Sequence, residues 1–430
     1  MIRTDSGMRK HIYLFTTIVL LLIHNLNYGQ SPQDSLTTQL EQEYKQSVFA
    51  GFTVAIVNKD SILYEHAFGY ADIASQKPYT THTLQPIASV SKLFIGMSVM
   101  KAVDQHLLSL DSDINSLLPF RITNPYSPKY PIRLHHLLTH TSGIADNKEI
   151  FKKTYYVFPP EPVNNPLYAF MKANGYGSTP PSGDSALGIF LKNYLNNNGT
   201  YYQKDNFLKA TPGKVFDYSN IASDLAAYIV EYKSGNSFAA YTKKYILTPL
   251  NMTQSCWSAA EADSNQLATL YTIDKMNYPK YGSICYPAGG LITSGHELSL
   301  FMKENIAGYY GNSNILTPTS FTTLMQPAFT EKNTPKYIAP DEPNIGVFYI
   351  FKKNGILGHT GSDGGVTSFF FFNPNKGFGM LFITNTEVQS VSGYNEQVLK
   401  DFEKIWRTLG QFGERLHVSQ KTHVNTSVTY

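Results

Sequence analysis

Strand-type sequence occurs near both ends of this 430-residue chain, with helical sequence between the two groups. Near the amino end, two apolar-rich runs are joined by the short polar segment Lys59-Asp60-Ser61, which predicts a β-hairpin. The predicted strands are Phe52–Asn58, Ile62–Phe68, Gly346–Phe351, Val366–Phe372 and Gly379–Thr384. Strands at both ends favour an α+β fold, in which helices flank one antiparallel sheet and a mostly helical part is inserted between the N- and C-terminal strands.

Apolar residues at helical spacing predict the helices that accompany this sheet. The predicted helices are Ser35–Phe49, residues 89–104, Ile221–Lys233, Ser294–Asn305 and Gln397–Leu409. Residues 145–210 are rich in Asn, Tyr, Pro and Gly, and predict a loop-and-helix insertion at the cleft within a single domain that spans residues 30–410. Residues 411–430 are polar and predict a disordered tail.

Charge and cysteine content exclude several classes of function. The 35 Lys and Arg residues against 32 Asp and Glu give a net charge of +3, and a near-neutral chain lacks the basic surface that nucleic-acid binding needs. Two cysteines, Cys256 and Cys285, exclude a disulfide scaffold and an all-cysteine zinc site.

The first thirty residues have the order of a secretory signal. Arg9 and Lys10 precede the apolar run Ile12–Ile23, which is followed by more polar residues up to Gly29. The run is shorter than the ~20 residues of a membrane span. We therefore expect residues 1–29 to be a signal peptide and the protein to be periplasmic or secreted; an uncleaved membrane anchor is the alternative. Export would permit a disulfide between the cysteines, although their spacing does not establish one.

Two S-x-x-K patterns occur, Ser89–Lys92 and Ser98–Lys101, in different contexts. Ser98 falls inside the predicted helix, where its hydroxyl would bond a backbone carbonyl one turn back. Ser89 begins that helix, at the positive end of its dipole, and Lys92 follows one turn later on the same face. A Lys amine beside a Ser hydroxyl can activate a nucleophile. The alternative is an N-cap serine with a solvated lysine.

Two further motifs carry side chains suited to catalysis or binding. Tyr218-Ser219-Asn220 follows a Pro-Gly turn and leads into an apolar helix; a phenol near a lysine can shuttle protons, and an amide can hold a substrate carbonyl. His359-Thr360-Gly361 offers a glycine that allows a ligand to approach the backbone of an edge strand. The alternatives are a core tyrosine with a capping asparagine, and an ordinary turn with a surface histidine.

Three histidines lie close together at positions 135, 136 and 140. His136 and His140 have a spacing that zinc sites use, but no Glu follows His136, so the H-E-x-x-H motif is absent. We interpret this segment as structural and expect no metal. The G-x-S-x-G elbow and the G-x-G-x-x-G and Walker patterns are absent from the sequence as well.

The order Ser89-x-x-Lys92, Tyr218-x-Asn220, His359-Thr360-Gly361 resembles the serine β-lactamase and penicillin-binding superfamily, specifically its class C β-lactamase and DD-peptidase branch. The resemblance spans about residues 36–405 and implies a β-lactamase/transpeptidase-like fold. Segments around the motifs agree with it: Pro86–Phe94, Leu108–Asp111, Ile132–Ile144, Thr211–Asn220, Pro249–Met252, Pro287–Leu291 and Gly358–Gly365. It also favours Ser89 over Ser98 as the functional serine.

The resemblance implies a role for each motif residue. Ser89 is the expected nucleophile that forms an acyl-enzyme, Lys92 activates it, and Tyr218 moves protons together with the lysine. Asn220 is expected to bind the substrate's amide carbonyl. The backbone N–H groups of Ser89 and Ser362 match an oxyanion hole. His359, Thr360 and Gly361 match the strand that binds the substrate, and no cofactor is implied.

His359 departs from class C β-lactamases, which usually have Lys there, whereas DD-carboxypeptidases of this branch often have His-Thr-Gly. The resemblance therefore implies first a D-alanyl-D-alanine carboxypeptidase-type peptidase on peptidoglycan-like peptides. An esterase or amidase, a weak β-lactamase, and a penicillin-binding sensor with little turnover stay open. The expected partners are a small peptide, ester or β-lactam, with no nucleic acid and with the membrane only through an uncleaved signal; the expected state is a monomer. An imidazolium at His359 would make carboxylate binding pH-dependent, and a neutral hydrogen bond or packing is the alternative.

Overall fold

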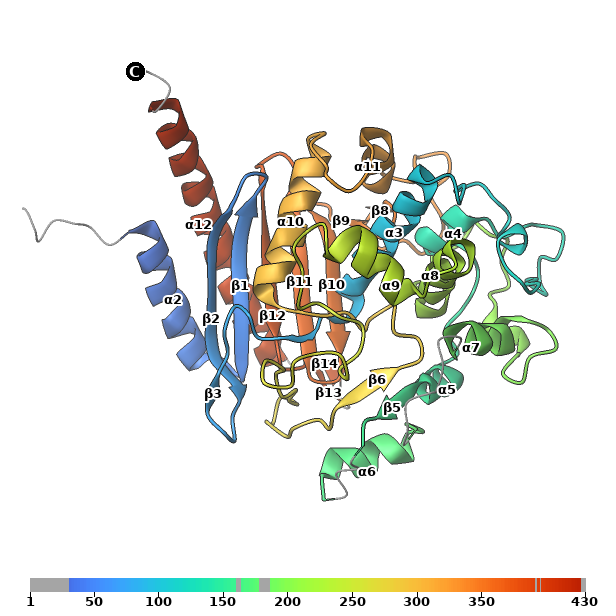
Figure 1. Ribbon diagram of the computed structural model, residues 1–430, viewed down its shortest axis with the longest axis horizontal. Helices are drawn as coiled ribbons and strands as arrows, with labels where there is room; N and C mark the ends of the chain where they lie inside the picture. The colour runs from blue at the N-terminus through green and yellow to red at the C-terminus, as the bar shows by residue number, and fades with distance from the viewer. Residues whose placement is uncertain (1–30, 160–163, 178–185, 391–392, 395, 427–430) are drawn as a thin grey trace, which may run out of the picture.

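An antiparallel sheet of eight strands forms the centre of the described part of the chain (Figure 1). The computed structural model describes residues 31–159, 164–177, 186–390, 393–394 and 396–426. The strand order is β3-β2-β1-β12-β11-β10-β9-β8. The strands are β1 (Gly51–Asn58), β2 (Ile62–Asp72), β3 (Lys77–Pro78), β8 (Asn344–Ile345), β9 (Ile350–Phe351), β10 (Leu357–Asp363), β11 (Val366–Asn373) and β12 (Phe378–Thr384).

The two ends of the chain meet in the middle of this sheet. Strand β1 pairs with β12 from Phe52 opposite Thr384 to Asn58 opposite Phe378. This pairing confirms the predicted α+β fold with strands from both ends in one sheet. The predicted strand Gly346–Phe351 is instead two short strands, β8 and β9, joined by a turn in which Gly346 N donates to Tyr349 O.

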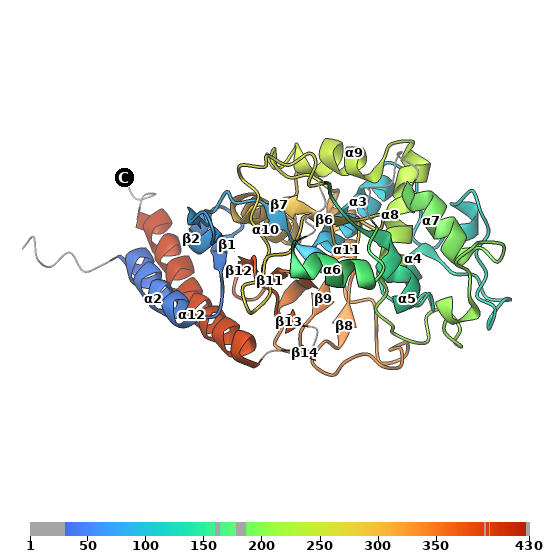
Figure 2. The ribbon, with the colours of Figure 1, turned by 90° about the horizontal axis from the view of Figure 1, so that it is seen from below.

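Helices cover both faces of the sheet. Helices α2 (Pro32–Gln46) and α12 (Glu396–Thr426) lie side by side on one face, and α10 (Gly295–Tyr309) crosses the other (Figures 1 and 2). Because side chains alternate along a strand, Val54 of β1 packs beneath α2 and α12, whereas Ala55 packs in the larger core on the opposite face. The remaining helices are α3 (Lys92–Asp104), α4 (Leu134–Leu138), α5 (Lys148–Phe151), α6 (Pro166–Ala173), α7 (Ala186–Leu195), α8 (Asn220–Ser234), α9 (Phe238–Thr242) and α11 (Pro318–Leu324).

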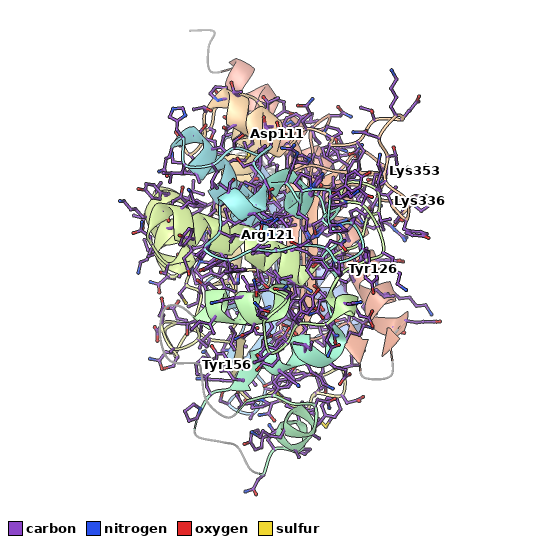
Figure 3. The ribbon with its side chains drawn as sticks, turned by 90° about the vertical axis from the view of Figure 1, so that its right-hand side faces the viewer. Asp111, Arg121, Tyr126, Tyr156, Lys336 and Lys353 are labelled. Atoms are coloured by element: carbon purple, nitrogen blue, oxygen red, sulfur yellow. The ribbon has the colours of Figure 1, made fainter. Side chains whose placement is uncertain are left out.

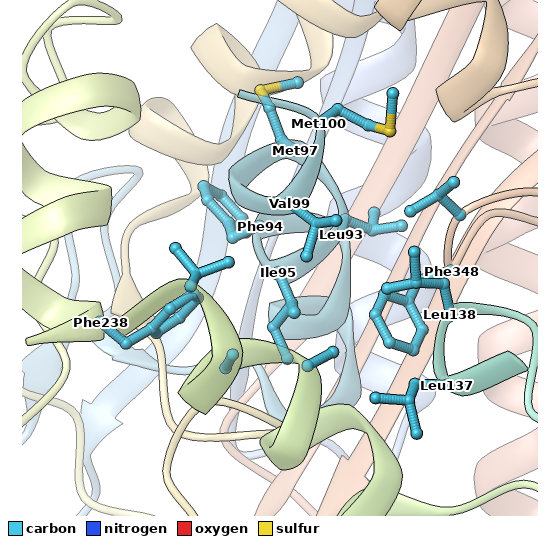
Figure 4. Packing of buried hydrophobic residues seen from close by; sticks show 14 of the residues in the cluster. Leu93, Phe94, Ile95, Met97, Val99, Met100, Leu137, Leu138, Phe238 and Phe348 are labelled. Atoms are coloured by element: carbon cyan, nitrogen blue, oxygen red, sulfur yellow. The ribbon is translucent and has the colours of Figure 1, made fainter. Parts of the chain in front are cut away.

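Helix α3 is buried on every side. Its residues from Lys92 to Met100 are all inaccessible to solvent, and Figure 4 shows Phe94 and Ile95 among apolar side chains from α4 and α9. A helix that is apolar all round belongs in the interior of a protein. The turn that precedes α3 is therefore held by the core, and this turn contains Ser89.

The end of the chain differs from the sequence prediction. Helix α12 continues beyond Leu409 to Thr426, so the predicted disordered tail from residue 411 is wrong for the described residues. Phe412 and Leu416 are buried in the same cluster as Leu409. Their spacing of three and four residues keeps them on one helix face, which extends the contact with the sheet.

The inserted region, residues 145–210, contains α5, α6, α7 and β5 (Tyr155–Val157) in its described part. Strand β5 pairs with β6 (Tyr281–Ser283), which ties the insertion to the segment before α10. The smaller strand pairs are β4 (Gln85–Pro86) with β7 (Ile292–Thr293), and β13 (Gln389–Ser390) with β14 (Gly393–Tyr394). The domain boundaries stay a prediction. In the part of the chain that the structure describes, no helix combines the length and apolar character of a membrane span.

Candidate active site

Ser89 lies in a 3₁₀ turn, Ala88–Ser91, that runs directly into α3. The predicted helix over residues 89–104 thus begins with a tighter turn, and Lys92 is the first residue of the α-helix proper. Ala88 has a φ of 46°, which is uncommon for a residue with a Cβ and marks local backbone strain. Ser89 is half-buried, whereas its neighbours in the turn are buried. Ser89 is therefore the one residue of this turn that is partly accessible to solvent.

Lys92 is buried completely and donates three hydrogen bonds. Its Nζ lies 3.1 Å from Ser89 Oγ, 2.7 Å from Asn220 Oδ1 and 2.8 Å from Ala288 O. An ammonium has three N–H donors, so these three neutral acceptors satisfy it completely. The alternative of a solvated lysine is wrong. Ser98, in the other S-x-x-K pattern, donates to Phe94 O at 2.7 Å inside α3, as the sequence predicted.

Tyr218 stands at the exposed side of the same cluster. Lys92 Nζ lies 4.9 Å from the centroid of the Tyr218 ring, and 37% of the tyrosine is accessible to solvent. An amine over an aromatic face is attracted by the ring electrons. The Tyr218 ring also packs against His140, with centroids 4.5 Å apart. The alternative of a core tyrosine is wrong, because the ring lies between the buried lysine and solvent.

Asp146 organises the start of α8, and the sequence analysis missed it. Its carboxylate accepts hydrogen bonds from Ser219 Oγ, from the backbone N–H groups of Asn220 and Ile221, and from Asn220 Nδ2, at 2.8–3.0 Å. A carboxylate suits the positive end of a helix dipole. Because Asn220 Nδ2 faces Asp146, its Oδ1 faces Lys92. No local pattern links Asp146 to residues more than 70 positions later.

A second carboxylate near Lys92, that of Asp224, is completely buried. Asp224, on α8, accepts from Ala288 N at 2.9 Å, and the carbonyl of Ala288 accepts from Lys92. Burial raises the pKa of Asp224 well above its ordinary value, and the charge of Lys92 opposes that rise. Ala288 thus connects the two buried groups through its own N–H and C=O.

Strand β10 approaches the serine turn through Gly361. A Cβ at this position would lie 2.4 Å from Ile87 O and 3.0 Å from Ser89 N, so only glycine fits. Among the described residues, β9 pairs with β10 only at Leu357 and Gly358. The edge of β10 from His359 onward is therefore free of a neighbouring strand among the described residues, and the approach of a ligand to Gly361 stays a prediction.

His359 is buried, with 2% of its surface accessible. Burial, followed by the charge of Lys92, lowers the pKa of His359 to about 3. Its ring lies 6.1 Å from that of Tyr218, and Nε2 has no hydrogen-bond partner among the described residues. The expectation of a surface histidine or an imidazolium near pH 6.5 is therefore wrong in this structure, because desolvation disfavours the charged ring. The alternative, in which His359 acts through a neutral hydrogen bond or packing, agrees with this burial.

The other histidines support backbone. His140 is buried, and its Nδ1 accepts from Ser219 N at 3.2 Å, directly beneath Tyr218. His136 Nδ1 accepts from Arg133 N at 3.0 Å, and burial lowers the pKa of His136 to about 4. Within the described residues, no group of three His, Cys, Asp or Glu side chains could hold a metal ion.

A cavity of about 120 Å³ opens beside Ser89. Ser89, Asn220, Ser362 and Asp363 form its polar part. Aromatic side chains form much of its wall: Phe151, Tyr155, Phe158, Trp257, Tyr281 and Tyr286. Tyr156, which also lines the cavity, is labelled in the lower half of Figure 3. We call this space the aromatic cavity. Cys285 belongs to it as well, and both cysteines are free thiols.

These contacts bring the predicted residues Ser89, Lys92, Tyr218 and Asn220 together, with β10 alongside. A half-buried hydroxyl bonded to a buried amine, under a solvent-facing phenol, has the parts that nucleophilic acyl transfer requires. The cavity beside the hydroxyl offers room for the substrate.

Comparisons with known proteins agree with this geometry. The family described as beta-lactamase matches residues 37–400. The Staphylococcus aureus protein flp is 21% identical over 398 residues, which cover 90% of this chain and 70% of flp.

Solved structures share the fold. The octameric penicillin-binding protein homologue of Pyrococcus abyssi has a TM-score of 0.65 at 22% identity, over 88% of this chain and 77% of that one. The β-lactamase/D-alanine carboxypeptidase of Yersinia pestis has a TM-score of 0.63 at 19% identity, over 89% and 97%. The D-amino acid amidase of Ochrobactrum anthropi has a TM-score of 0.62 at 18% identity, over 88% and 99%. Because the family match spans most of the sequence and the fold agrees, this chain belongs to the beta-lactamase family of serine hydrolases.

Proposed function

We propose that the protein is a D-alanyl-D-alanine carboxypeptidase-type peptidase, which cleaves short peptides of the peptidoglycan kind through an acyl-enzyme on Ser89. The observation that carries this proposal is the contact of Ser89 Oγ with the buried Nζ of Lys92 at 3.1 Å. The His-Thr-Gly sequence on β10 and the likeness to the Yersinia pestis carboxypeptidase support the peptide substrate.

In the first half of the proposed reaction, Ser89 Oγ attacks the scissile carbonyl carbon. In this proposal the Lys92–Tyr218 pair begins the reaction one proton short, as a neutral amine or a phenolate, and accepts the serine proton. The N–H groups of Ser89 and Ser362 stabilise the oxyanion. As the C–N bond breaks, the pair gives that proton to the leaving amine. Tyr218 suits this transfer because it is the solvent-facing member of the pair.

In the second half, water attacks the ester carbonyl of the acyl-enzyme. Its proton returns through the same pair to Ser89 Oγ, and the free acid leaves. Lys92 Nζ lies 4.9 Å from the centroid of the Tyr218 ring, so the two side chains are proposed to act together in both halves of the reaction.

A second candidate, an amidase or esterase, is favoured by one observation. The His359 ring lies 6.1 Å from the Tyr218 ring, on the side of the leaving group, and its low pKa of about 3 keeps it neutral. A substrate with a free carboxylate would then be held by neutral donors only. The fold is shared with the D-amino acid amidase of Ochrobactrum anthropi, which suits this candidate.

A substrate panel separates these candidates. Purified protein would be given a D-Ala-D-Ala peptide, a D-amino acid amide, p-nitrophenyl esters and nitrocefin, with Ser89→Ala as the control. Steady release of D-alanine supports the peptidase. Turnover of only the amide or the esters supports the second candidate, and turnover of nitrocefin alone supports a weak β-lactamase. A single burst of acylation would identify a penicillin-binding sensor.

We also propose that the protein is exported and that residues 1–29, which lie outside the described residues, are its signal peptide. The supporting feature is the basic pair Arg9-Lys10 before the apolar run. Fractionation of the native host with N-terminal sequencing should find a chain that begins near Gln30 outside the cytoplasm. A full-length cytosolic chain would contradict the proposal.

A further inference from the structure

Asp363 lies on the same face of β10 as Gly361, the residue at which this strand approaches Ser89. The missing side chain of Gly361 would point at Ser89 N, and residues two apart on a strand lie on the same face. At ~3.3 Å per residue, the backbone of Asp363 lies about 7 Å along the strand from Gly361. Ser362, between them, is exposed and lines the cavity as well. The carboxylate of Asp363 therefore lines the aromatic cavity a short distance from the acylation site.

The hydrogen bonds that the Asp363 carboxylate accepts among the described residues come from neutral groups. Its carboxylate accepts from Tyr155 Oη at 3.2 Å and from Gly364 N at 2.8 Å, both neutral donors. Among the described residues it forms no ion pair, although Lys92 is near enough to act on its charge. Burial raises the pKa of Asp363 above its ordinary value. Asp363 is a half-buried carboxylate without a paired cation, so it is available to form a charged hydrogen bond with a ligand cation.

The aromatic side chains around Asp363 are also suited to a positively charged ligand. The Tyr155 ring packs against Tyr176 and Tyr281, with centroids 5.1 Å and 6.1 Å away. The Tyr281 hydroxyl is turned away to Gly364 O, which leaves the ring itself as cavity wall. Aromatic faces attract ammonium groups, and the attraction is strongest in sites shielded from water. Aromatic rings around a carboxylate form a site for a substrate ammonium.

The position of the cavity also decides which half of the substrate it takes. Tyr218, His359 and Thr360 do not line it, whereas Ser89, Asn220 and Ser362 do. In the proposed reaction Tyr218 protonates the leaving amine, so the leaving group lies on the Tyr218 side. The aromatic cavity then takes the acyl half.

We propose that Asp363 binds an ammonium on the acyl half of the substrate, so that the protein prefers aminoacyl or peptidyl groups with a positive charge near the scissile carbonyl. The inference rests on the proposed acyl-enzyme mechanism and specifies the substrate class of that site. The ammonium can be the α-amino group of a single amino acid or the side-chain amine of a diamino acid in a peptide.

Matched substrate pairs test this proposal and separate the two sources. One pair is D-alanine p-nitroanilide and its N-acetyl derivative. The other is Nα-acetyl-D-lysine p-nitroanilide and its Nα,Nε-diacetyl derivative. We expect wild-type kcat/KM to favour the ammonium member of at least one pair by about tenfold or more, the effect of one charged hydrogen bond. The pair that responds identifies the source.

Asp363→Asn should remove that preference. The amide oxygen can still accept from Tyr155, so the variant changes mainly the charge. We expect kcat/KM for the ammonium substrate to fall about tenfold and that for the acetylated partner to stay within about threefold. Asp60→Asn, an exposed acid in the β1–β2 turn, is the matched control and should leave both substrates unchanged.

Other outcomes overturn the proposal. Equal losses on both members of each pair would make Asp363 a turn-stabilising residue, and wild-type protein without any preference would exclude the ammonium site. Labelling of Ser89 by a neutral fluorophosphonate reports the acyl-enzyme separately. If Asp363→Asn does not fold, competitive inhibition of wild type decides: phenethylammonium should inhibit at a concentration at least about tenfold lower than phenethyl alcohol. Equal inhibition would refute the site.

Discussion

The Nζ of Lys92 lies 2.7 Å from Oδ1 of Asn220, a contact that joins the start of α3 to the start of α8. The same amine reaches Ser89 Oγ, so the position of the nucleophile depends on two helix starts at once. Asp146, which lies outside both helices, holds the start of α8 in place through its hydrogen bond from Asn220. The site is thus a junction between helices that the buried core holds in place, and each contact in it can be tested.

Lys92 is expected to contribute to both activity and stability. Lys92→Met should lower kcat/KM by about 100-fold to 10,000-fold, the usual contribution of a proton-transfer group. The melting temperature should fall, because methionine leaves Ala288 O and Asn220 Oδ1 without their donor. Lys101→Met, in the other S-x-x-K pattern, is the control and should keep full activity. Retained activity in Lys92→Met would contradict its role.

Asp146 is expected to act as a positioning residue for Asn220. Asp146→Asn places an amide where four donors converge and should cost about 1–3 kcal/mol in the free energy of unfolding. It should also lower kcat more than it raises KM, because Asn220 no longer holds Lys92 in place. Urea denaturation and steady-state kinetics measure both effects. Asp205→Asn, an exposed acid, is the matched control, and an equally small effect of the two variants would refute the role.

Gly361 is expected to tolerate no side chain. Gly361→Ala would push a Cβ into Ile87 O and against Ser89 N, so the strand or the serine turn must move. The rate of acylation by a fluorophosphonate should fall strongly. Gly410→Ala is the comparison, because a Cβ in α12 meets only Met380 at 3.9 Å, and alanine should stabilise that helix by up to about 1 kcal/mol. Normal acylation of Gly361→Ala would contradict the close approach.

His359 is expected to stay neutral throughout the working pH range. With a pKa of about 3, it contributes no charge change between pH 5 and 8. Substrates with and without a carboxylate should therefore have the same pH profile of kcat/KM. A limb near pH 6.5 that occurs only with the carboxylate substrate, and moves in His359→Lys, would restore the imidazolium.

The lowered pKa of His359 also affects the stability of the folded protein in acid. The folded pKa lies below the unfolded value of about 6.5, so the unfolded chain binds more protons between these values. The contribution of neutral His359 is complete above pH 6.5 and is lost as the pH falls toward 3. Acid unfolding of His359→Gln should show a weaker dependence on pH in this window than that of wild type. Identical curves would argue against a buried, neutral histidine.

The local sequence predicted those residues of the site that lie near the start of a helix. Ser89, Lys92, Tyr218 and Asn220 lie within a turn of the start of α3 or α8, where motif and periodicity coincide. The sheet followed from the apolar runs at the two ends. The pairing of β1 with β12 is a long-range contact, yet the antiparallel arrangement was implied because few other partners exist for these strands.

Contacts between distant segments could not be predicted in this way. Asp146 contacts Asn220 across 74 residues and Ala288 contacts Lys92 across 196 residues, without any shared local pattern. The burial of His359 depends on the packing of Tyr218 and β10, so its charge state was predicted wrongly. The end of α12 was missed because the polar residues after Leu416 obscured the apolar face formed by Leu409, Phe412 and Leu416.

The central claim is that Ser89 carries the acyl group. Purified protein would be incubated with a fluorescent penicillin or a fluorophosphonate, and the labelled peptide would be identified by mass spectrometry. We predict one adduct, on Ser89, and none in Ser89→Ala. An adduct on Ser98 or another serine, or full labelling of Ser89→Ala, would contradict the proposed mechanism.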